Sequence, residues 1–335
     1  MTVPSARFAA ARRVLSRWAP CGLAAWLVAA SFNAAAFDLE AHRGGRGLRP
    51  ENTLAAFENA IRIGVTTLEL DIAITADGVA VISHEPYVFA GLARDADGKW
   101  LAQNGPLIHS LKLAELQRYD VGRLNPALGY GRGFPSQQPR DGERIPTLAS
   151  LFELVKRLGA NDVQFDIETK VFPDRPGDTL APEQFVPILL GVIRDAGMTG
   201  RVMIESFDWR TLGIVQRLEP AMRTVFLTVQ SKGMDNVGSP AWTAGRVLAD
   251  YPSLADMVHA AGATVWSPNQ RNIDAAAVAR AHGLGLLVVP WTVNDPADMG
   301  RLIDWKVDGI ITDYPDRLRE VMRERDMALP RPAGH

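Results

Sequence analysis

The chain alternates between short runs rich in β-forming residues and longer segments with helical spacing, and this alternation limits its fold more than any other feature. The expected strands are residues 39–42, 66–74, 163–170, 201–207, 224–229, 263–268, 286–293 and 309–312. The expected helices are residues 53–63, 148–158, 182–196, 209–218, 254–261, 273–282, 296–305 and 315–323. Eight strand–helix units predict an α/β fold of the TIM (β/α)8 barrel type. The rival is an open doubly wound sheet, but the sequence carries no dinucleotide-binding fingerprint.

One stretch interrupts the alternation after the second strand. Residues 75–78 have the turn sequence TADG and precede a short expected strand, 79–83. An irregular sequence rich in Gly, Pro, Asn and Gln then fills residues 122–143. Loops of this length in compact domains are commonly functional or disordered. We therefore expect an insertion, about residues 86–146, over the mouth of the barrel.

The first 36 residues differ from the rest in composition. Residues 1–17 carry four arginines and no acidic residue, the apolar run 19–32 follows, and residues 34–36 are Ala-Ala-Ala. This order predicts a cleaved secretory signal peptide, 1–36, and an exported domain, 37–335, in the periplasm or outside the cell. A membrane anchor is the alternative, but the apolar run is shorter than the roughly 20 residues of a spanning helix. The pair Arg12 and Arg13 also leaves twin-arginine export open.

Charge and cysteine content exclude several classes of protein. The full chain has a net charge of −2, and without residues 1–36 its 32 basic residues oppose 38 acidic ones, a net charge of −6. Nucleic-acid-binding domains carry a basic excess, so we expect no nucleic-acid partner. The single cysteine, Cys21, lies in the expected leader, which excludes an intrachain disulfide framework and a Cys-rich zinc site.

Carboxylates lie on two of the expected strands. Glu69 and Asp71 are two residues apart, so their side chains point to the same face, and Glu168 and Lys170 repeat this spacing on the next parallel strand. The active site of a TIM barrel lies at the carboxyl ends of its strands. Three carboxylates meeting there suit one hard divalent cation, Ca²⁺ or Mg²⁺. Alternatively, Glu69 or Asp71 only pairs with Arg43 or Lys170.

Two histidines, His42 and His84, end separate strands at the same rim. Together they can serve as general acid and general base near neutral pH, although one structural and one exposed histidine would give the same pattern. Arg43 and Lys170 add positive charge suited to a phosphate. The combination with a metal site predicts cleavage of a phosphoric ester. Trp291, on the seventh strand, is the tryptophan expected to line the pocket.

A specific resemblance supports this prediction. Residues 41–86 read AHRGGRGLRPENTLAAFENAIRIGVTTLELDIAITADGVAVISHEP, which resembles the signature of the glycerophosphodiester phosphodiesterase family: H-R-G, P-E-N-T, E-x-D, T-x-D-G and V-x-x-H-D. Later blocks also resemble the family, in the same order: ERIPTL at 143–148, IETK at 167–170, ESFD at 205–208, PWTVN at 290–294 and VDGIITDYPD at 307–316. The resemblance therefore covers essentially the whole of residues 37–335.

The resemblance implies a TIM barrel with an insertion after the second strand. It also implies a metal-dependent enzyme that hydrolyses small glycerophosphodiesters to an alcohol and glycerol 3-phosphate. The implied roles are these: His42 and His84 catalyse, Glu69, Asp71 and Glu168 bind the metal, Arg43 and Lys170 contact the phosphate, and Glu51 and Asn52 belong to the P-E-N motif. One departure is Glu85, which stands where the family has aspartate.

Two alternative functions remain beside this one. A phospholipase D-type member of the same superfamily would act on intact phospholipids and would need an apolar loop at the barrel mouth. The insertion is instead rich in Gly, Pro, Arg and Gln, which favours a water-soluble diester. A non-catalytic barrel that only binds phosphodiesters would have lost part of the histidine or carboxylate set, and here that set is complete.

Overall fold

Eight parallel strands form the barrel wall in this computed structural model, which describes residues 37–334. The neighbouring strands follow the order β8-β7-β6-β5-β4-β2-β1-β9, and β3 pairs antiparallel with β2. The strands are β1 (Asp38–Ala41), β2 (Thr67–Ile74), β3 (Ala80–Ile82), β4 (Gln164–Thr169), β5 (Val202–Ser206), β6 (Arg223–Thr228), β7 (Val265–Pro268), β8 (Leu287–Val288) and β9 (Gly309–Thr312). The TIM barrel prediction is therefore confirmed.

Backbone hydrogen bonds close the barrel between β8 and β9. The Asp308 N–H donates to the carbonyl of Val288 (2.8 Å), and the Ile311 N–H donates to that of Pro290 (3.0 Å). The Val293 N–H then donates to the carbonyl of Ile311 (3.0 Å). The eighth wall position is thus filled mainly by chain that follows the two-residue strand β8, which is shorter than the predicted strand 286–293.

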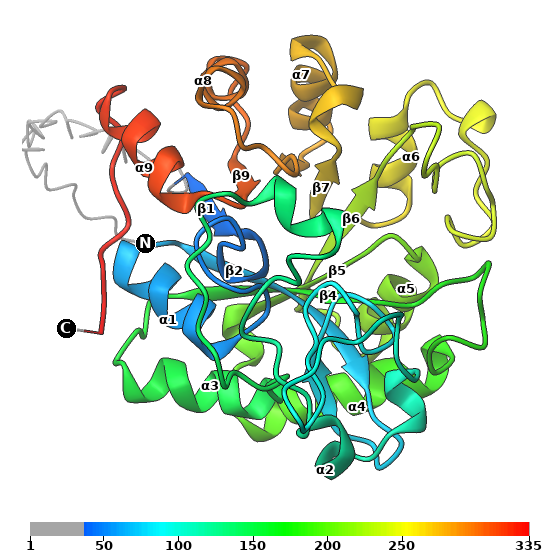
Figure 1. The fold of residues 1–335 in the computed structure, drawn as a ribbon. Coiled ribbons are helices and arrows are strands. Elements are labelled where there is room, and N and C mark those ends of the chain that lie inside the picture. The colour runs from blue at the N-terminus through cyan, green and yellow to red at the C-terminus, as the bar shows by residue number, and fades with distance from the viewer. Residues whose placement is uncertain (1–36, 335) are drawn as a thin grey trace, which may run out of the picture. The chain divides into compact units, whose positions relative to one another are not determined.

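A helix follows each barrel strand and covers the outside of the wall (Figure 1). Most of these helices begin at a capping residue or at proline: the Thr53 hydroxyl accepts from the Ala56 N–H, the Asp208 carboxylate accepts from the Arg210 N–H, and Pro182 opens α4. The helices are α1 (Leu54–Ile63), α3 (Leu148–Arg157), α4 (Pro182–Asp195), α5 (Trp209–Leu218), α6 (Leu254–Ala260), α7 (Ala275–Gly283), α8 (Pro296–Asp304) and α9 (Pro315–Arg323).

Most of the apolar core lies between the strands and the helices. The outer faces of β2 and β4 present Leu68, Leu70 and Phe165, which pack with buried residues of the surrounding helices such as Phe57 and Phe152. A smaller apolar cluster inside the barrel contains Met203, Val225 and Val265. Burial of the wall on both faces keeps the strands in register and fixes where each strand ends.

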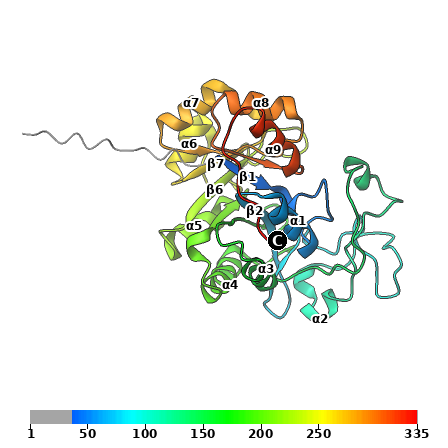
Figure 2. The same cartoon turned by 90° about the vertical axis from the view of Figure 1, so that its left-hand side faces the viewer.

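The insertion between β3 and α3 has a core of its own. Val88, Ala93, Ile108, Leu116 and Val121 are buried together there, against one face of the hairpin formed by β2 and β3. The segment contains the short helix α2 (Leu113–Leu116) and the 3-10 turn Gly129–Gly133, and Figure 2 shows it standing out on one side of the barrel. The irregular composition of the insertion thus still allows an ordered segment with buried side chains.

A sharp turn follows β1 at the barrel mouth. His42 begins a 3-10 turn (His42–Gly44) instead of ending the strand, and Arg43 adopts a left-handed conformation with φ 50°. Gly44 has φ 77°, and a Cβ atom there would lie 2.9 Å from the Cβ of Ala56. Glycine is therefore required for the turn to pack against α1, which brings His42 and Arg43 over the barrel mouth.

The N-terminal segment 1–36, predicted to be a signal peptide, lies outside the described residues. Within residues 37–334, none of the helices combines the length and the apolar character needed to span a bilayer.

Candidate active site

A cavity of about 110 Å³ opens at the carboxyl ends of the barrel strands. Its lining brings together both predicted catalytic histidines and residues from several separate strands. These lining residues include His42, Arg43, Arg46, Glu69, His84, Glu168, Glu205, Phe207 and Trp291. The ring of Trp291 packs edge-on against Phe207, with ring centres 5.2 Å apart, and its indole N–H donates to the Ser267 carbonyl (3.0 Å). Trp291 is therefore a fixed wall of the cavity.

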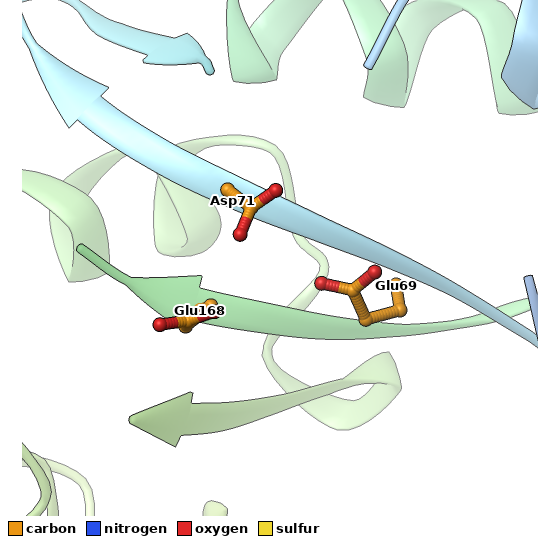
Figure 3. Close-up of side chains that lie close together, drawn as sticks. All are labelled: Glu69, Asp71 and Glu168. Atoms are coloured by element: carbon orange, nitrogen blue, oxygen red, sulfur yellow. The ribbon is translucent and has the colours of Figure 1, made fainter. Parts of the chain in front are cut away.

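The carboxylates of Glu69, Asp71 and Glu168 converge beside this cavity, and we call them the mouth carboxylates (Figure 3). One oxygen of each lies within 4.8 Å of the others, and all three side chains are buried. The sheet register explains the convergence, because Asp71 on β2 pairs directly with Glu168 on β4. The two-residue spacing then places Glu69 on the same face, one step lower in the barrel.

Two cations contact the mouth carboxylates. The Lys170 ammonium lies 2.9 Å from Glu168 and 3.6 Å from Asp71. The Arg43 backbone N–H donates to Glu69 (2.7 Å), and its Nε lies 3.4 Å from Asp71, an ion pair without a hydrogen bond. The sequence left two alternatives for these carboxylates, ion pairing and metal binding. Both involve the same side chains in the structure.

The mouth carboxylates fit a divalent cation by the chemistry of their donors. They offer oxygen atoms only, which suits Ca²⁺ or Mg²⁺ better than a softer metal. Burial, reinforced by Asp71, raises the pKa of Glu69 well above its usual range, and burial raises that of Glu168 to about 7 although Lys170 opposes the shift. Arg43 and Lys170 therefore offset only part of the negative charge that the three groups carry when ionised.

His42 is held at the cavity by a carboxylate from the last strand of the barrel. Its Nδ1 lies 2.6 Å from Asp313, directly after β9, and its Nε2 lies 3.9 Å from Glu69. Burial, Arg46 and Arg43 together lower the pKa of His42 to about 4, although Asp313 raises it. Because Asp313 occupies Nδ1, Nε2 is the nitrogen left to face a reacting group.

His84 lines the same cavity and has a matching arrangement. Its Nδ1 lies 2.9 Å from the carboxylate of the adjacent Glu85, which is the longer side chain that replaces the aspartate of the family pattern. Burial, Arg43 and Lys170 lower the pKa of His84 to about 4, although Asp71 and Glu85 raise it. The departure at Glu85 therefore still provides a carboxylate partner for the histidine.

The P-E-N residues support the turn that carries His42 and Arg43. The Asn52 backbone N–H donates to the Arg43 carbonyl (2.9 Å), and its side-chain amide donates to Asp71 (2.9 Å). The side-chain cap of α1 is Thr53. Glu51 accepts from the Arg43 guanidinium (2.9 Å). Both residues are buried, and each joins the mouth carboxylates or Arg43 to the loop before α1.

Several site residues received no role from the sequence. Arg46 lines the cavity and donates to Asp313 (2.7 Å), which also accepts from Asn294 (2.7 Å). Glu205 also lines the cavity, and one of its buried oxygens accepts no hydrogen bond from an N–H group or hydroxyl of the described residues. Asp313 directly follows the predicted strand 309–312, which was the available signal, but its pairing with His42 spans 271 residues.

Two further carboxylates lie inside the barrel and differ from the mouth set. Glu40 on β1 and Asp166 on β4 are fully buried, and no N–H group or hydroxyl among the described residues donates to any of their four oxygens. Burial, reinforced by neighbouring acids, raises the pKa of each well above its usual range. We call these two residues the core carboxylates, and burial without such a donor disfavours their ionised form.

A TIM barrel with paired histidines, buried carboxylates and cations at its mouth has the architecture of a phosphoric diester hydrolase. Comparison with known proteins agrees: the sequence model of the Glycerophosphoryl diester phosphodiesterase family matches residues 42–317, and the chain belongs to this family. The prediction of a phosphodiesterase is thereby confirmed.

Individual relatives show how far the similarity extends. The glycerophosphodiester phosphodiesterase of Bacillus subtilis (strain 168) is 30% identical over 293 residues, which cover 84% of this chain and 85% of the relative. A crystal structure of a protein from Silicibacter pomeroyi DSS-3 is 34% identical with a TM-score of 0.78, and the match covers 88% of this chain and 95% of that one.

A more distant structure shares the fold. The Oleispira antarctica phosphodiesterase OLEI02445, solved in complex with its product sn-glycerol-3-phosphate, is 22% identical with a TM-score of 0.62. The match covers 85% of this chain and 96% of that one.

Proposed function

We propose that the enzyme hydrolyses water-soluble glycerophosphodiesters to an alcohol and glycerol 3-phosphate, with His42 and His84 as general acid and general base. The observation that carries this proposal is the paired arrangement of the histidines: each lines the cavity, and each has its Nδ1 held by a carboxylate. The names of the relatives and the product bound to the Oleispira protein support the substrate class.

Each histidine has a defined part in the reaction. One neutral imidazole takes the proton of the attacking hydroxyl, which belongs to water or to the glycerol 2-hydroxyl of the substrate. The bond between phosphorus and the leaving oxygen breaks, and the other histidine, protonated, gives a proton to the departing alcohol. If the glycerol hydroxyl attacks, a cyclic phosphate forms and water opens it in a second step. Asp313 and Glu85 hold the two rings so that Nε2 faces the substrate.

Glu69, Asp71 and Glu168 would hold one divalent cation, Ca²⁺ or Mg²⁺. When bound, such a cation lowers the pKa of an attacking hydroxyl and stabilises negative charge on the phosphoryl oxygens. Arg43 and Lys170 lie beside these carboxylates, and they are the phosphate contacts in this proposal. Their positive charges attract the anionic diester and offset the charge that develops on phosphorus-bound oxygens.

Histidine variants test the catalytic assignment. We expect His42→Ala and His84→Ala each to reduce kcat by about 10²–10⁴ on glycerophosphocholine, the usual range for a general acid or base. His282→Ala is the matched control, because His282 also pairs with a carboxylate, Asp308 at 2.9 Å, but at the exposed surface. Near-normal kcat in either cavity variant would refute the assignment.

Metal removal tests the cation assignment. We expect EDTA to abolish activity, and Ca²⁺ or Mg²⁺ added in excess to restore it. An enzyme that keeps full activity after exhaustive EDTA dialysis, with no metal found by elemental analysis, would contradict the proposal. An assay on intact phosphatidylcholine vesicles beside glycerophosphocholine separates this substrate class from the phospholipase D-type alternative.

We also propose that the protein is exported to the periplasm or secreted, since residues 1–36 have the composition of a secretory signal. Cell fractionation of the expressed full-length chain, with N-terminal sequencing of the product, tests this. Cleavage close to residue 36 is expected, and an intact N-terminus in the cytoplasmic fraction would contradict it.

A further inference from the structure

A tyrosine of the insertion reaches back to the catalytic turn. Tyr130, in the 3-10 turn Gly129–Gly133, donates its hydroxyl hydrogen to the Glu51 carboxylate. The same hydroxyl oxygen lies 3.3 Å from an Arg46 guanidinium nitrogen, which donates to it. Glu51 and Arg46 belong to the segment between β1 and α1, so this contact joins the insertion to the turn that carries His42 and Arg43.

Glu51 bridges Tyr130 and Arg43. One Glu51 oxygen accepts from Tyr130, and the other accepts from the Arg43 guanidinium at 2.9 Å. Glu51 is buried, and Arg43 is buried beside the mouth carboxylates. Only one side chain therefore stands between the tyrosine hydroxyl and the guanidinium proposed to contact the phosphate.

The charges at this contact keep it intact at ordinary pH. Burial raises the pKa of Glu51, but Arg43, Arg46 and the Tyr130 hydroxyl together lower it by more than burial raises it. The pKa of Glu51 therefore lies below its usual value. Burial and the Glu51 charge raise the pKa of the Tyr130 phenol. The phenol therefore stays protonated and donates to an ionised carboxylate, which is the stronger form of such a hydrogen bond.

The ring of Tyr130 is held independently of its hydroxyl. It packs edge-on against Phe89, with ring centres 5.0 Å apart, and against Phe134 at 5.5 Å. The Arg46 guanidinium also lies over the ring of Phe134, 4.9 Å from its centre. Removal of the hydroxyl alone should therefore leave the insertion docked while it frees one oxygen of Glu51.

We infer that Tyr130 is a positioning residue that fixes the orientation of Arg43 through Glu51, so that docking of the insertion sets the affinity for the phosphodiester. Without the hydroxyl, the buried carboxylate has one donor fewer and can turn, and the guanidinium turns with it. The inference rests on the proposed role of Arg43 in phosphate binding.

Tyr130→Phe tests the inference, and Tyr119→Phe is the matched control. Tyr119 lies in the same insertion, and its hydroxyl makes no hydrogen bond with any described residue. For Tyr130→Phe we expect about a tenfold higher KM for glycerophosphocholine and about a tenfold weaker Kd for inorganic phosphate by calorimetry, the scale of a lost hydrogen bond to a charged group. We expect kcat to change less than about twofold, because the hydroxyl supports binding alone.

Tyr130→Phe with unchanged KM and unchanged phosphate Kd would overturn the inference. A fall in kcat together with a lowered Tm would also overturn it, because that pattern marks a general structural role. Tyr119→Phe should leave all these values unchanged.

A double-mutant cycle of Tyr130→Phe with Glu51→Gln tests whether Tyr130 acts on Arg43 through Glu51. If Tyr130 acts through Glu51, the double variant should bind phosphate no more weakly than Glu51→Gln alone, whereas additive losses would overturn the route. Arg43→Ala separates the two proposals. Normal phosphate binding by Arg43→Ala would refute the proposed role of Arg43, whereas a loss there with a normal Tyr130→Phe would refute only the inference.

Discussion

The mouth carboxylates and the core carboxylates lie in the same barrel, and β4 carries a member of each set, yet their surroundings differ. Arg43, Lys170 and Asn52 contact the mouth set, whereas in residues 37–334 no N–H group or hydroxyl donates to the core pair. The two-residue spacing is identical: Glu168 follows Asp166 just as Asp71 follows Glu69. Burial raises the pKa of Glu69 and Glu168 despite their donors, whereas His84, Arg43, Lys170 and Asn52 together lower the pKa of Asp71 below its usual range. Several charges and donors must therefore converge on a buried acid before they outweigh its burial.

The largest expected difference between the two sets is in activity. Asp71→Asn removes a charge that Lys170 and Arg43 face, and with it one proposed cation ligand. We expect kcat/KM on glycerophosphocholine to fall by about 10³, equivalent to several kcal/mol of transition-state stabilisation. Glu40→Gln in the core set should keep activity within about twofold. Equal losses of kcat/KM in Asp71→Asn and Glu40→Gln would show that the two sets do not differ in function.

Asp313 belongs to neither set and extends the comparison, because it lies at the barrel mouth and its carboxylate is paired with His42. Asp313→Asn should reduce kcat/KM by about 10–100-fold, the usual cost of losing a carboxylate that orients an imidazole. Burial, Arg46 and Arg43 lower the pKa of His42 and Asp313 raises it, so this variant should lower that pKa further. A profile of kcat/KM against pH should then show the limb that belongs to His42 displaced toward acid. Displacement toward alkali would contradict the assigned pairing.

Cation binding should stabilise the enzyme only where the mouth set is intact. At a divalent cation concentration of 100 times Kd, we expect about 2.7 kcal/mol of stabilisation, or a Tm rise of roughly 5–10 °C. Glu40→Gln should show the same rise, and Asp71→Asn should lose most of it. Differential scanning fluorimetry with Ca²⁺ and Mg²⁺ measures this, and a rise retained by Asp71→Asn would place the cation elsewhere.

The smallest expected effect is a pH-dependent gain in the stability of the Glu40→Gln variant over the wild type. Because folding raises the pKa of Glu40 above its unfolded value, the folded state loses relative stability as pH rises above that unfolded value. Glu40→Gln has no proton to release, so its advantage over the wild type should grow with pH. We expect about 2–4 °C in Tm at pH 8, equivalent to about 1 kcal/mol, and almost none at pH 4. An advantage that shrinks with rising pH would show that Glu40 is ionised.

The regular parts of the molecule were predictable from sequence because periodic patterns determine them. Alternating strands and helices predicted the barrel, and spacing on parallel strands predicted that Glu69, Asp71 and Glu168 meet. The partners of these residues were not predictable in this way. Asp313 meets His42 only when the barrel closes, and Tyr130 reaches Glu51 from a segment without periodicity. Such contacts depend on tertiary packing, which local spacing does not encode.

Local conformation also limited the prediction. His42 was expected to end a strand, but the chain turns one residue earlier because Arg43 and Gly44 take positive φ. The strand 286–293 was expected at full length, yet regular pairing covers only β8. The chain after β8 instead pairs with β9 at single positions, and Pro290 within it has no N–H to donate.

The insertion has its own buried cluster, and its chain returns to the barrel beside the β2–β3 hairpin, where the Ile82 N–H donates to the Pro146 carbonyl (2.8 Å). A segment with this construction can be exchanged, lengthened or redesigned without rebuilding the barrel core. The barrel wall that carries the histidines and carboxylates and the insertion that contacts Glu51 are thus separate packing units. For protein engineering, a redesign of residues 86–146 would have to keep the contact that Tyr130 makes with Glu51 if the insertion is to go on supporting Arg43.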